Sequence, residues 1–197
     1  MMPLAGALAR ALAGPLFDWL VSGDVPLLDS ETLSQLIAQH RRASASASML
    51  TTTLEDATGY GRVVRSQNGA VDRIVEHKDA SEAELAVREI NAGIYVFVAT
   101  DLRAQLPKLD QNNAQGEKYI TDVVGFLRGD GKSVEALEVS HSWKVEGIND
   151  RSQLAAAAGQ LNAMIIRGWQ MAGVTIIDPH STWIDLQVQL AADVEIR

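Results

Sequence analysis

Short apolar runs alternate with helix-like segments between residues 17 and 150, and this alternation constrains the fold more than any other feature of the chain. The dipeptide Asn68-Gly69, between two alternating segments, predicts a β-hairpin. Strands alternating with helices are typical of an α/β domain, so we expect a mostly parallel sheet with helices on both faces. The patterns predict strands at 17–22, 44–54, 90–98 and 133–139, and helices beginning at Asp29 or Ser30 and spanning 118–128.

The pattern changes at Asp150. Residues 151–172 predict one long helix rich in Ala, Leu and Ile, which Gly173 ends. Beyond Gly173, aliphatic residues recur at every sixth position. This spacing is typical of a β-helix, in which each face of a triangular coil presents one inward aliphatic side chain. The alternative is chance alternation in an ordinary β tail. We therefore expect a domain at 1–150, a linker helix at 151–172 and a β-helical start at 173–197. The aliphatic residues with this period are Ile184, Leu190 and Ile196, with Val188 and Val194 two places earlier in each turn.

The composition narrows the class of protein. The chain has 197 residues and is 47% hydrophobic, which is enough to bury a core. Its formal net charge of −8 disfavours nucleic acid and anionic membranes as partners. The lack of cysteine excludes disulfides, thiolate metal sites and a cysteine nucleophile, and it fits the cytoplasm, which is the location we expect. The apolar start lacks the basic region of a signal peptide, and Pro3, Pro15 and Asp18 interrupt it too often for a membrane span.

The segment Gly-Asp-Val-Pro, at residues 23–26, carries the first candidate site residue. Asp24 follows an expected strand, and ligands of open parallel sheets bind beyond the carboxyl ends of the strands. A carboxylate at that position suits Mg²⁺, which takes few protein oxygens beside the phosphates of a substrate. The alternative is that Asp24 only caps the turn before the next helix.

Other polar segments are candidates with a structural alternative each. Asn149 ends a short apolar segment, but Asn149 or Asp150 can equally cap the long helix. The glycines of residues 58–62 would let the backbone approach a ligand, although their spacing is not that of a phosphate-binding loop. Residues 112–122 are a further candidate, and their alternative is a plain polar loop. Glu76 is also a candidate, and its alternative is the solvated end of a hairpin. The four histidines lack metal-ligand spacing, and no Ser/His/Asp set is visible.

The order of these segments points to a known family. GDVPLL, TGYGRVVR, VDRIVEHKDA, EINAGIYVF, NNAQGEKYITDVV, VEGINDRSQL and AGVTIIDPHSTWID follow one another from about Leu20 to the end. Together they closely resemble the bifunctional N-acetylglucosamine-1-phosphate uridyltransferase/glucosamine-1-phosphate acetyltransferase of bacteria. The resemblance implies a Rossmann-like domain that makes UDP-N-acetylglucosamine and pyrophosphate from UTP and N-acetylglucosamine 1-phosphate, for peptidoglycan and lipopolysaccharide precursors. It also implies a left-handed β-helix that carries the acetyltransferase and assembles as trimers.

The resemblance also implies roles for particular residues. Asp24 and Asn149 match the two protein ligands of Mg²⁺ in the family. The family has a different residue before Gly-Asp, where this chain has Ser22. No covalent intermediate is implied, so no residue is expected to act as a nucleophile. By the same matching, Gly61, Glu76 and Asn91 would contact the amino sugar and its neighbouring groups. All the positions that match substrate-binding residues are Ser22, Gly23, Asp24, Gly61, Glu76, Asn91 and Asn149.

The chain departs from the family at both ends. Residues 1–19 do not match the opening strand and glycine-rich loop that hold the triphosphate, or the Gln and Gly-Thr pair that read uracil. Only the first coils of the β-helix are expected, without acetyltransferase residues. We therefore expect a chain truncated at both ends, of marginal stability or prone to association because sheet edges lose their cover. Three readings stay open: a uridyltransferase, an inactive sugar-phosphate-binding remnant, and a nucleotidyltransferase for another sugar.

Overall fold

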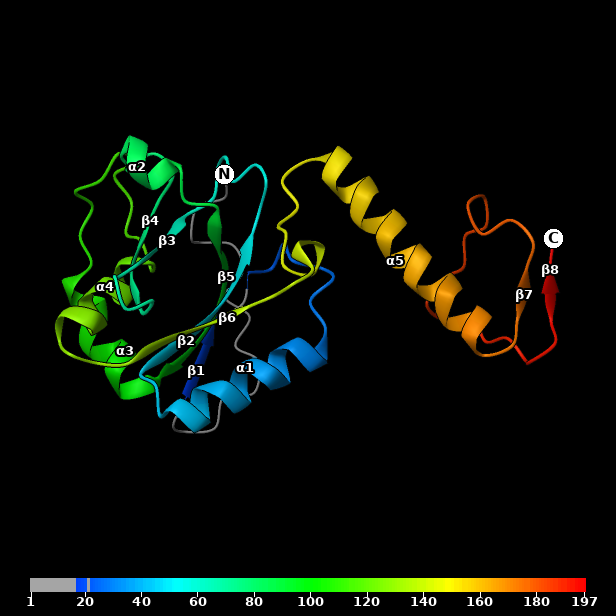
Figure 1. Cartoon of the computed structure of the whole chain (residues 1–197), viewed down its shortest axis with the longest axis horizontal. Coiled ribbons are helices and arrows are strands. Elements are labelled where there is room, and N and C mark those ends of the chain that lie inside the picture. Colours follow the sequence, from blue (N-terminus) through cyan, green and yellow to red (C-terminus); the bar gives the residue numbers. More distant parts are fainter. Residues whose placement is uncertain (1–16, 21) are drawn as a thin grey trace. The chain divides into compact units, whose positions relative to one another are not determined.

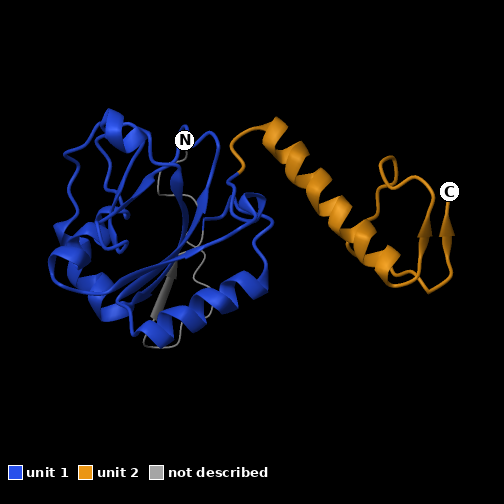
Figure 2. Ribbon diagram, viewed as in Figure 1, with its two compact units in different colours: residues 1–147 blue, residues 148–197 orange. Residues whose placement is uncertain are grey.

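The computed structural model describes residues 17–20 and 22–197. The chain divides into two compact units, one ending at Gly147 and one spanning Ile148–Arg197 (Figure 2). Our predictions for the apolar start of the chain lie outside the described residues. The expected division at 150 and 172 stays a prediction.

The first unit is built on a six-stranded mixed sheet of order β4-β3-β5-β2-β6, with β1 also paired to β5. β3 and β1 follow one another along the same edge of β5, since Arg62 faces Ile90 and Leu20 faces Tyr95. Along the other edge β5 pairs with β2. The strands are β1 (Phe17–Leu20), β2 (Ala47–Thr53), β3 (Arg62–Arg65), β4 (Val71–Val75), β5 (Glu89–Val98) and β6 (Val134–Glu138).

The prediction of a mostly parallel sheet is wrong for the described strands. Within this sheet only β2 and β6 run parallel, whereas β1–β5, β2–β5, β3–β4 and β3–β5 are antiparallel. The apolar run of β5 reports burial on both faces, and that burial is compatible with either strand direction. The predicted β3–β4 hairpin is confirmed, and Gly69 in its loop has a φ of +83° that favours glycine.

Helices cover both faces of this sheet, as predicted (Figure 1). Asp29 is the N-cap of the first helix, and its side chain accepts a hydrogen bond from Thr32 N at 2.7 Å. The second predicted helix begins at Asp122, later than the expected residue 118. The helices are α1 (Ser30–Ala43), α2 (Glu82–Leu85), α3 (Ala99–Gln105) and α4 (Asp122–Gly129), with 3₁₀ turns η1 (Leu106–Lys108) and η2 (Ser142–Lys144).

Two apolar cores lie on the two faces of the sheet because successive residues of β5 point to opposite sides. Ile94 and Val96 pack with Leu36 of α1 and with Val145. Tyr95 and Phe97 pack on the other face with residues of α3 and α4, among them Leu127. The central strand is therefore fixed from both sides, which gives the loops at its amino-terminal half a rigid support.

The second unit begins with α5 (Arg151–Met171), whose N-cap is Asp150. The Asp150 side chain accepts from Gln153 N, and the Gln153 side chain accepts from the backbone at Asp150. The helix is followed by Gly173, which has a φ of +95°. Across the described part of the chain, no helix combines the length and apolar character needed to cross a membrane.

After α5 the chain makes a parallel strand pair, β7 (Thr175–Ile176) with β8 (Glu195–Ile196). Ile184, Leu190 and Ile196 lie in one apolar cluster with Ile166 of α5, in keeping with their six-residue period. Val188 does not follow the pattern, because it is 38% exposed. A left-handed β-helix stays a prediction for this segment.

Candidate functional site

Gly61, Glu76 and Asn91 come together where β3, β4 and β5 adjoin. Asn91 N donates to the Gly61 carbonyl oxygen at 2.9 Å. A Cβ atom at Gly61 would lie 3.4 Å from Glu76 Oε2 and 3.1 Å from Ile74 Cγ2, so a side chain at 61 would crowd the carboxylate. The hairpin thus brings three of the predicted sugar-binding residues into one cluster, in which Gly61 leaves room beside the carboxyl group.

The Glu76 carboxyl group is electrostatically unusual. Burial raises its pKa, the charges of Asp122 and Asp79 raise it further, and a hydrogen bond from Thr121 opposes them. The Thr121 hydroxyl donates to Glu76 Oε1 at 2.9 Å. Thr121 is itself buried and directly precedes α4. Sequence reasoning placed Thr121 at the end of a polar segment, inside the first turns of the helix expected at 118–128, and no local pattern identifies a hydroxyl that reaches a residue 45 positions away.

Tyr95 is a second residue of the cluster that sequence reasoning missed, because it belongs to the apolar run of β5. It is fully buried. Burial raises the pKa of Tyr95, the charge of Glu76 adds to the rise, and the nearby Asn91 side chain opposes it. The phenol is thus within electrostatic reach of the Glu76 carboxyl group and the Asn91 carboxamide.

Ser22 approaches the same strand at Gly93, between the part of β5 that pairs with β3 and the part that pairs with β1. A Cβ atom at Gly93 would lie 2.8 Å from Ser22 Oγ, and Gly93 has a φ of +72°, so both space and conformation require glycine. The register between β2 and β5 shifts at this point, between Met49 and Thr51. Asn91 Oδ1 accepts a hydrogen bond from Gly93 N at 3.1 Å, which connects Ser22 to the Asn91 cluster.

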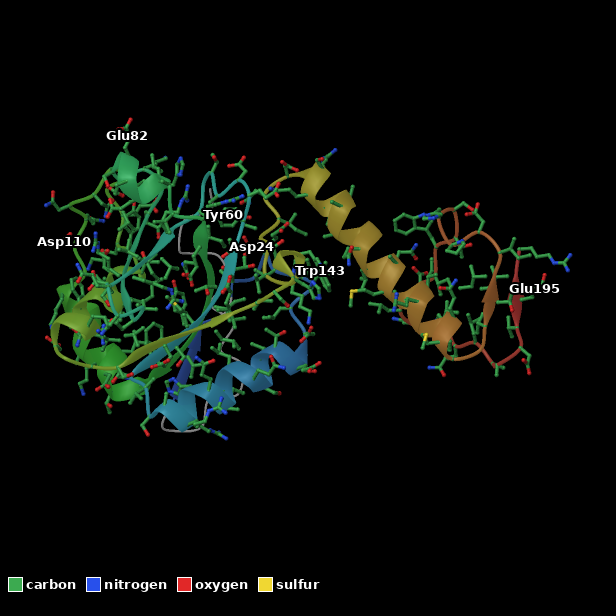
Figure 3. All side chains as sticks on the ribbon, viewed as in Figure 1. Asp24, Tyr60, Glu82, Asp110, Trp143 and Glu195 are labelled. Carbon is green, nitrogen blue, oxygen red and sulfur yellow. The ribbon has the colours of Figure 1, made fainter. Side chains whose placement is uncertain are left out.

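Asp24 lies further along the same loop, after the exposed Gly23, and its side chain is half-buried. A Cβ atom at Gly147 would lie 2.8 Å from Asp24 Oδ2, so the carboxylate rests directly against backbone that carries no side chain. Tyr60 lies close by (Figure 3). Burial raises the pKa of Tyr60, the charges of Glu146 and Asp24 raise it further, and a hydrogen bond with the Gly147 backbone opposes them.

Asn149 belongs to the second unit, whereas the other predicted site residues belong to the first. The cap of α5 is made by Asp150, which answers the alternative role that the sequence left open for Asn149. The backbone N of Asn149 donates to Gln153 Oε1 at 2.6 Å. No group of three or more His, Asp or Glu side chains within the described residues is arranged to hold a metal ion. Asp24 and Asn149 as joint metal ligands stay a prediction.

The first unit thus carries two kinds of ligand-binding group. The Glu76 carboxyl, the Asn91 carboxamide and the backbone at Gly61 and Gly93 provide hydrogen-bonding groups of the kind that recognise a polyhydroxylated or amide-bearing ligand. The Asp24 carboxylate provides a hard oxygen ligand suited to a divalent cation. A ligand carrying both a sugar and a phosphate fits this pairing.

A family model and several curated proteins match most of this chain. The family model described as nucleotidyl transferase matches residues 7–185. The chain is 59% identical over 177 residues to the bifunctional protein GlmU of Leifsonia xyli subsp. xyli, an alignment that covers 90% of this chain and 36% of that protein. The GlmU of Clavibacter sepedonicus is 54% identical with the same coverage of both chains. A crystal structure of apo-UDP-glucose pyrophosphorylase matches with a TM-score of 0.48 and 14% identity, over 64% of this chain and 48% of that one.

The chain therefore spans about 36% of the length of these two relatives. The match of the family model extends over most of the sequence, through both units. On this basis the chain belongs to the nucleotidyl transferase family.

Proposed function

We propose that the chain is a uridyltransferase that joins UTP and N-acetylglucosamine 1-phosphate to give UDP-N-acetylglucosamine and pyrophosphate, a step towards peptidoglycan and lipopolysaccharide precursors. One observation carries the proposal: Gly61, Glu76 and Asn91, each matched by sequence to a sugar-binding residue, are connected through a backbone hydrogen bond and a close packing contact. Such convergence from separate strands supports a ligand site more than a set of unrelated loop residues would.

The cluster supports recognition of the amino sugar. Glu76 is held by Thr121, and Asn91 by the backbone of Gly93, so their polar groups are oriented before a ligand binds. The raised pKa of Glu76 makes its carboxyl group easier to protonate, so it is suited to a hydrogen bond with a hydroxyl or amide of the sugar. Preorganised groups of this kind position the sugar phosphate for reaction.

The reaction we propose is an in-line displacement. An oxygen of the sugar phosphate attacks the α-phosphorus of UTP, a new P–O bond forms, and the bond from the α-phosphorus to the bridging oxygen breaks. Pyrophosphate leaves with the electron pair of that bond, so no oxidant, reductant or covalent enzyme intermediate is needed. The protein contributes orientation and charge stabilisation.

Mg²⁺ is the cofactor we propose. The donor set fits it, because the half-buried Asp24 carboxylate and an amide oxygen from Asn149 are hard ligands and Mg²⁺ takes only one or two protein groups beside phosphates. When bound, the ion would neutralise charge on the phosphates. Asp24 itself is held against the Gly147 backbone, which fixes the direction of its carboxylate.

We propose further that α5 is a linker helix and that residues 173–197 begin a left-handed β-helix, the part of the family that forms trimers. The parallel pairing of Thr175 with Glu195 supports this proposal, because successive coils of a β-helix bring such positions side by side. The shared cluster of Ile184, Leu190 and Ile196 supports it as well. The cytoplasm is the location that fits nucleotide and sugar-phosphate substrates.

The test is a substrate panel. Pyrophosphate release from the full chain would be measured with UTP and three acceptors: N-acetylglucosamine 1-phosphate, glucosamine 1-phosphate and glucose 1-phosphate. We expect N-acetylglucosamine 1-phosphate to be turned over best. A higher turnover with either of the other two sugar phosphates would refute the proposed substrate. Calorimetric binding of N-acetylglucosamine 1-phosphate without turnover by a folded chain would instead identify the sugar-phosphate-binding remnant.

A further inference from the structure

We propose that Lys144 is a positioning residue for Asp24, acting through an ion pair with Asp29 that ties two loops of the site together. The inference rests on the proposed function, because it assumes that the Asp24 carboxylate holds a divalent cation. It concerns residues of the first unit alone. The two loops are residues 22–29, which lead into α1, and residues 139–147, which contain η2.

The ion pair is short and shared with a helix cap. Lys144 Nζ lies 2.6 Å from Asp29 Oδ2, and the two side chains are 21% and 34% exposed. The other oxygen of the same carboxylate, Oδ1, accepts the hydrogen bond from Thr32 N at 2.7 Å. One carboxylate therefore holds the start of α1 and the end of η2 at once. The hydrogen bond from Lys144, followed by that from Thr32, lowers the pKa of Asp29 to about 2, so the pair is fully charged at neutral pH.

The two loops meet at three successive places. Val25 and Val145 lie in the same buried core, at 8% and 1% exposure. Asp24 rests against Gly147, where a Cβ atom would be 2.8 Å from Oδ2. The ion pair is the third contact, at the far end of the first loop. Apolar contact is non-directional, whereas a short charged hydrogen bond fixes a geometry, so the pair sets how the first loop lies on the second.

Neighbouring aromatic groups restrict Lys144 further. Its ammonium lies 5.9 Å from the centre of the Trp143 ring, and that ring stacks on His141 with centroids 5.7 Å apart. The lysine therefore loses few additional rotamers when it binds Asp29. A preorganised lysine of this kind favours a fixed loop over an occasional surface contact.

Loss of the pair should displace Asp24 more than it unfolds the protein. Lys144 and Asp29 keep part of their surface in solvent, while Val25 and Val145 stay buried without them. Groups that orient a metal ligand from outside typically contribute 10–100-fold to metal affinity. We therefore expect removal of the ion pair to weaken cation binding by about tenfold.

Three variants isolate the pair. Lys144→Met keeps the aliphatic stem and removes the charge. Asp29→Ser keeps a helix N-cap and removes the partner of the lysine. Lys144→Arg should retain most of the cation binding of the unaltered chain, because it keeps the positive charge that pairs with Asp29. The matched control is Lys132→Met, which removes an equally simple pair, Lys132 Nζ to Asp101 Oδ1 at 3.2 Å, away from both loops.

The experiment measures Mn²⁺ binding to the full chain by water proton relaxation, and hydrogen exchange of residues 22–29 by mass spectrometry. We expect Lys144→Met and Asp29→Ser to weaken Mn²⁺ binding about tenfold and to speed exchange in 22–29, while Lys144→Arg and Lys132→Met behave like the unaltered chain. Unchanged Mn²⁺ binding in both pair variants would overturn the inference, as would an equal loss in Lys132→Met or no binding to the unaltered chain. An unaltered chain that binds Mn²⁺ in this Lys144-dependent way but releases no pyrophosphate would refute the proposed reaction and leave the inference standing.

Discussion

The contact between Asp24 and Gly147 gives the sharpest prediction, which concerns Gly147→Ala. The new Cβ atom would lie 2.8 Å from Asp24 Oδ2 and 3.4 Å from its Cγ. Ordinary contacts begin at 3.4 Å, so the carboxylate oxygen must withdraw by about 0.6 Å. Misplacing a reacting group by about 1 Å can cost about 100-fold in rate, so we expect kcat/KM for pyrophosphate release to fall by roughly tenfold or more.

Stability should change little in the same variant. Gly147 does not have a positive φ, so alanine fits its backbone without strain. Asp24 is half-buried and can turn towards solvent. Substituting alanine for glycine also reduces the entropy of the unfolded chain by about 0.4–1 kcal/mol, which offsets part of the crowding. We therefore expect the free energy of unfolding to change by less than about 1 kcal/mol.

The assay pairs Mg²⁺-dependent pyrophosphate release with thermal unfolding followed by circular dichroism. Gly129→Ala is the control, because a Cβ atom at Gly129 would meet nothing within 4 Å. A Gly147→Ala variant with unchanged turnover would refute the reasoning that Asp24 must hold this position. An equal loss in the control would refute it too.

Three further predictions follow from single residues. Glu76→Gln should raise the melting temperature at neutral pH, because the folded state raises the pKa of this carboxyl above its ordinary 4.5 and so opposes its ionisation; the gain should vanish below pH 4.5, and a melting series across pH checks it. Gly159→Ala should stabilise α5 by about 1 kcal/mol in urea unfolding, since a Cβ atom there would meet nothing within 4 Å, and a destabilised variant would contradict the open environment. Gly93→Ala should destabilise the chain by about 1–3 kcal/mol in the same assay, because of its φ of +72° and the Ser22 hydroxyl 2.8 Å away; a neutral result would show that the turn of β5 does not need glycine.

Features that depend on neighbouring residues could be predicted from the sequence. Asn68 and Gly69 form the loop of the β3–β4 hairpin because the requirement for a positive φ lies within the turn itself. Asp29 caps α1 through a residue three positions away. The direction of the strands is different, because β5 pairs with segments far from it in the chain and its apolar residues report only burial. The loop ahead of α4 likewise makes a contact that no local pattern predicts, in which Asp79 Oδ1 accepts from Ala114 N at 2.8 Å.

Some residues of the candidate site could also be predicted from the sequence, whereas others depend on contacts in the folded chain. Gly61, Glu76 and Asn91 were found through the order of sequence segments, and the sheet then brings them together. Thr121 and Tyr95 could not be predicted as site residues, because a hydroxyl in the first turns of an expected helix and a phenol in an apolar run carry no periodic signal. Their importance depends on contacts with Glu76 and Asn91 that only the folded chain makes.

We propose that this chain transfers a uridylyl group with a metal held by Asp24. The most direct measurement is pyrophosphate release from UTP and N-acetylglucosamine 1-phosphate across a Mg²⁺ titration, for the full chain and for Asp24→Asn, with melting temperatures for both. We expect Mg²⁺-dependent release by the full chain and a loss of at least about 100-fold in Asp24→Asn at an unchanged melting temperature. Equal rates in the two proteins, or no release by a folded full chain, would contradict this proposal.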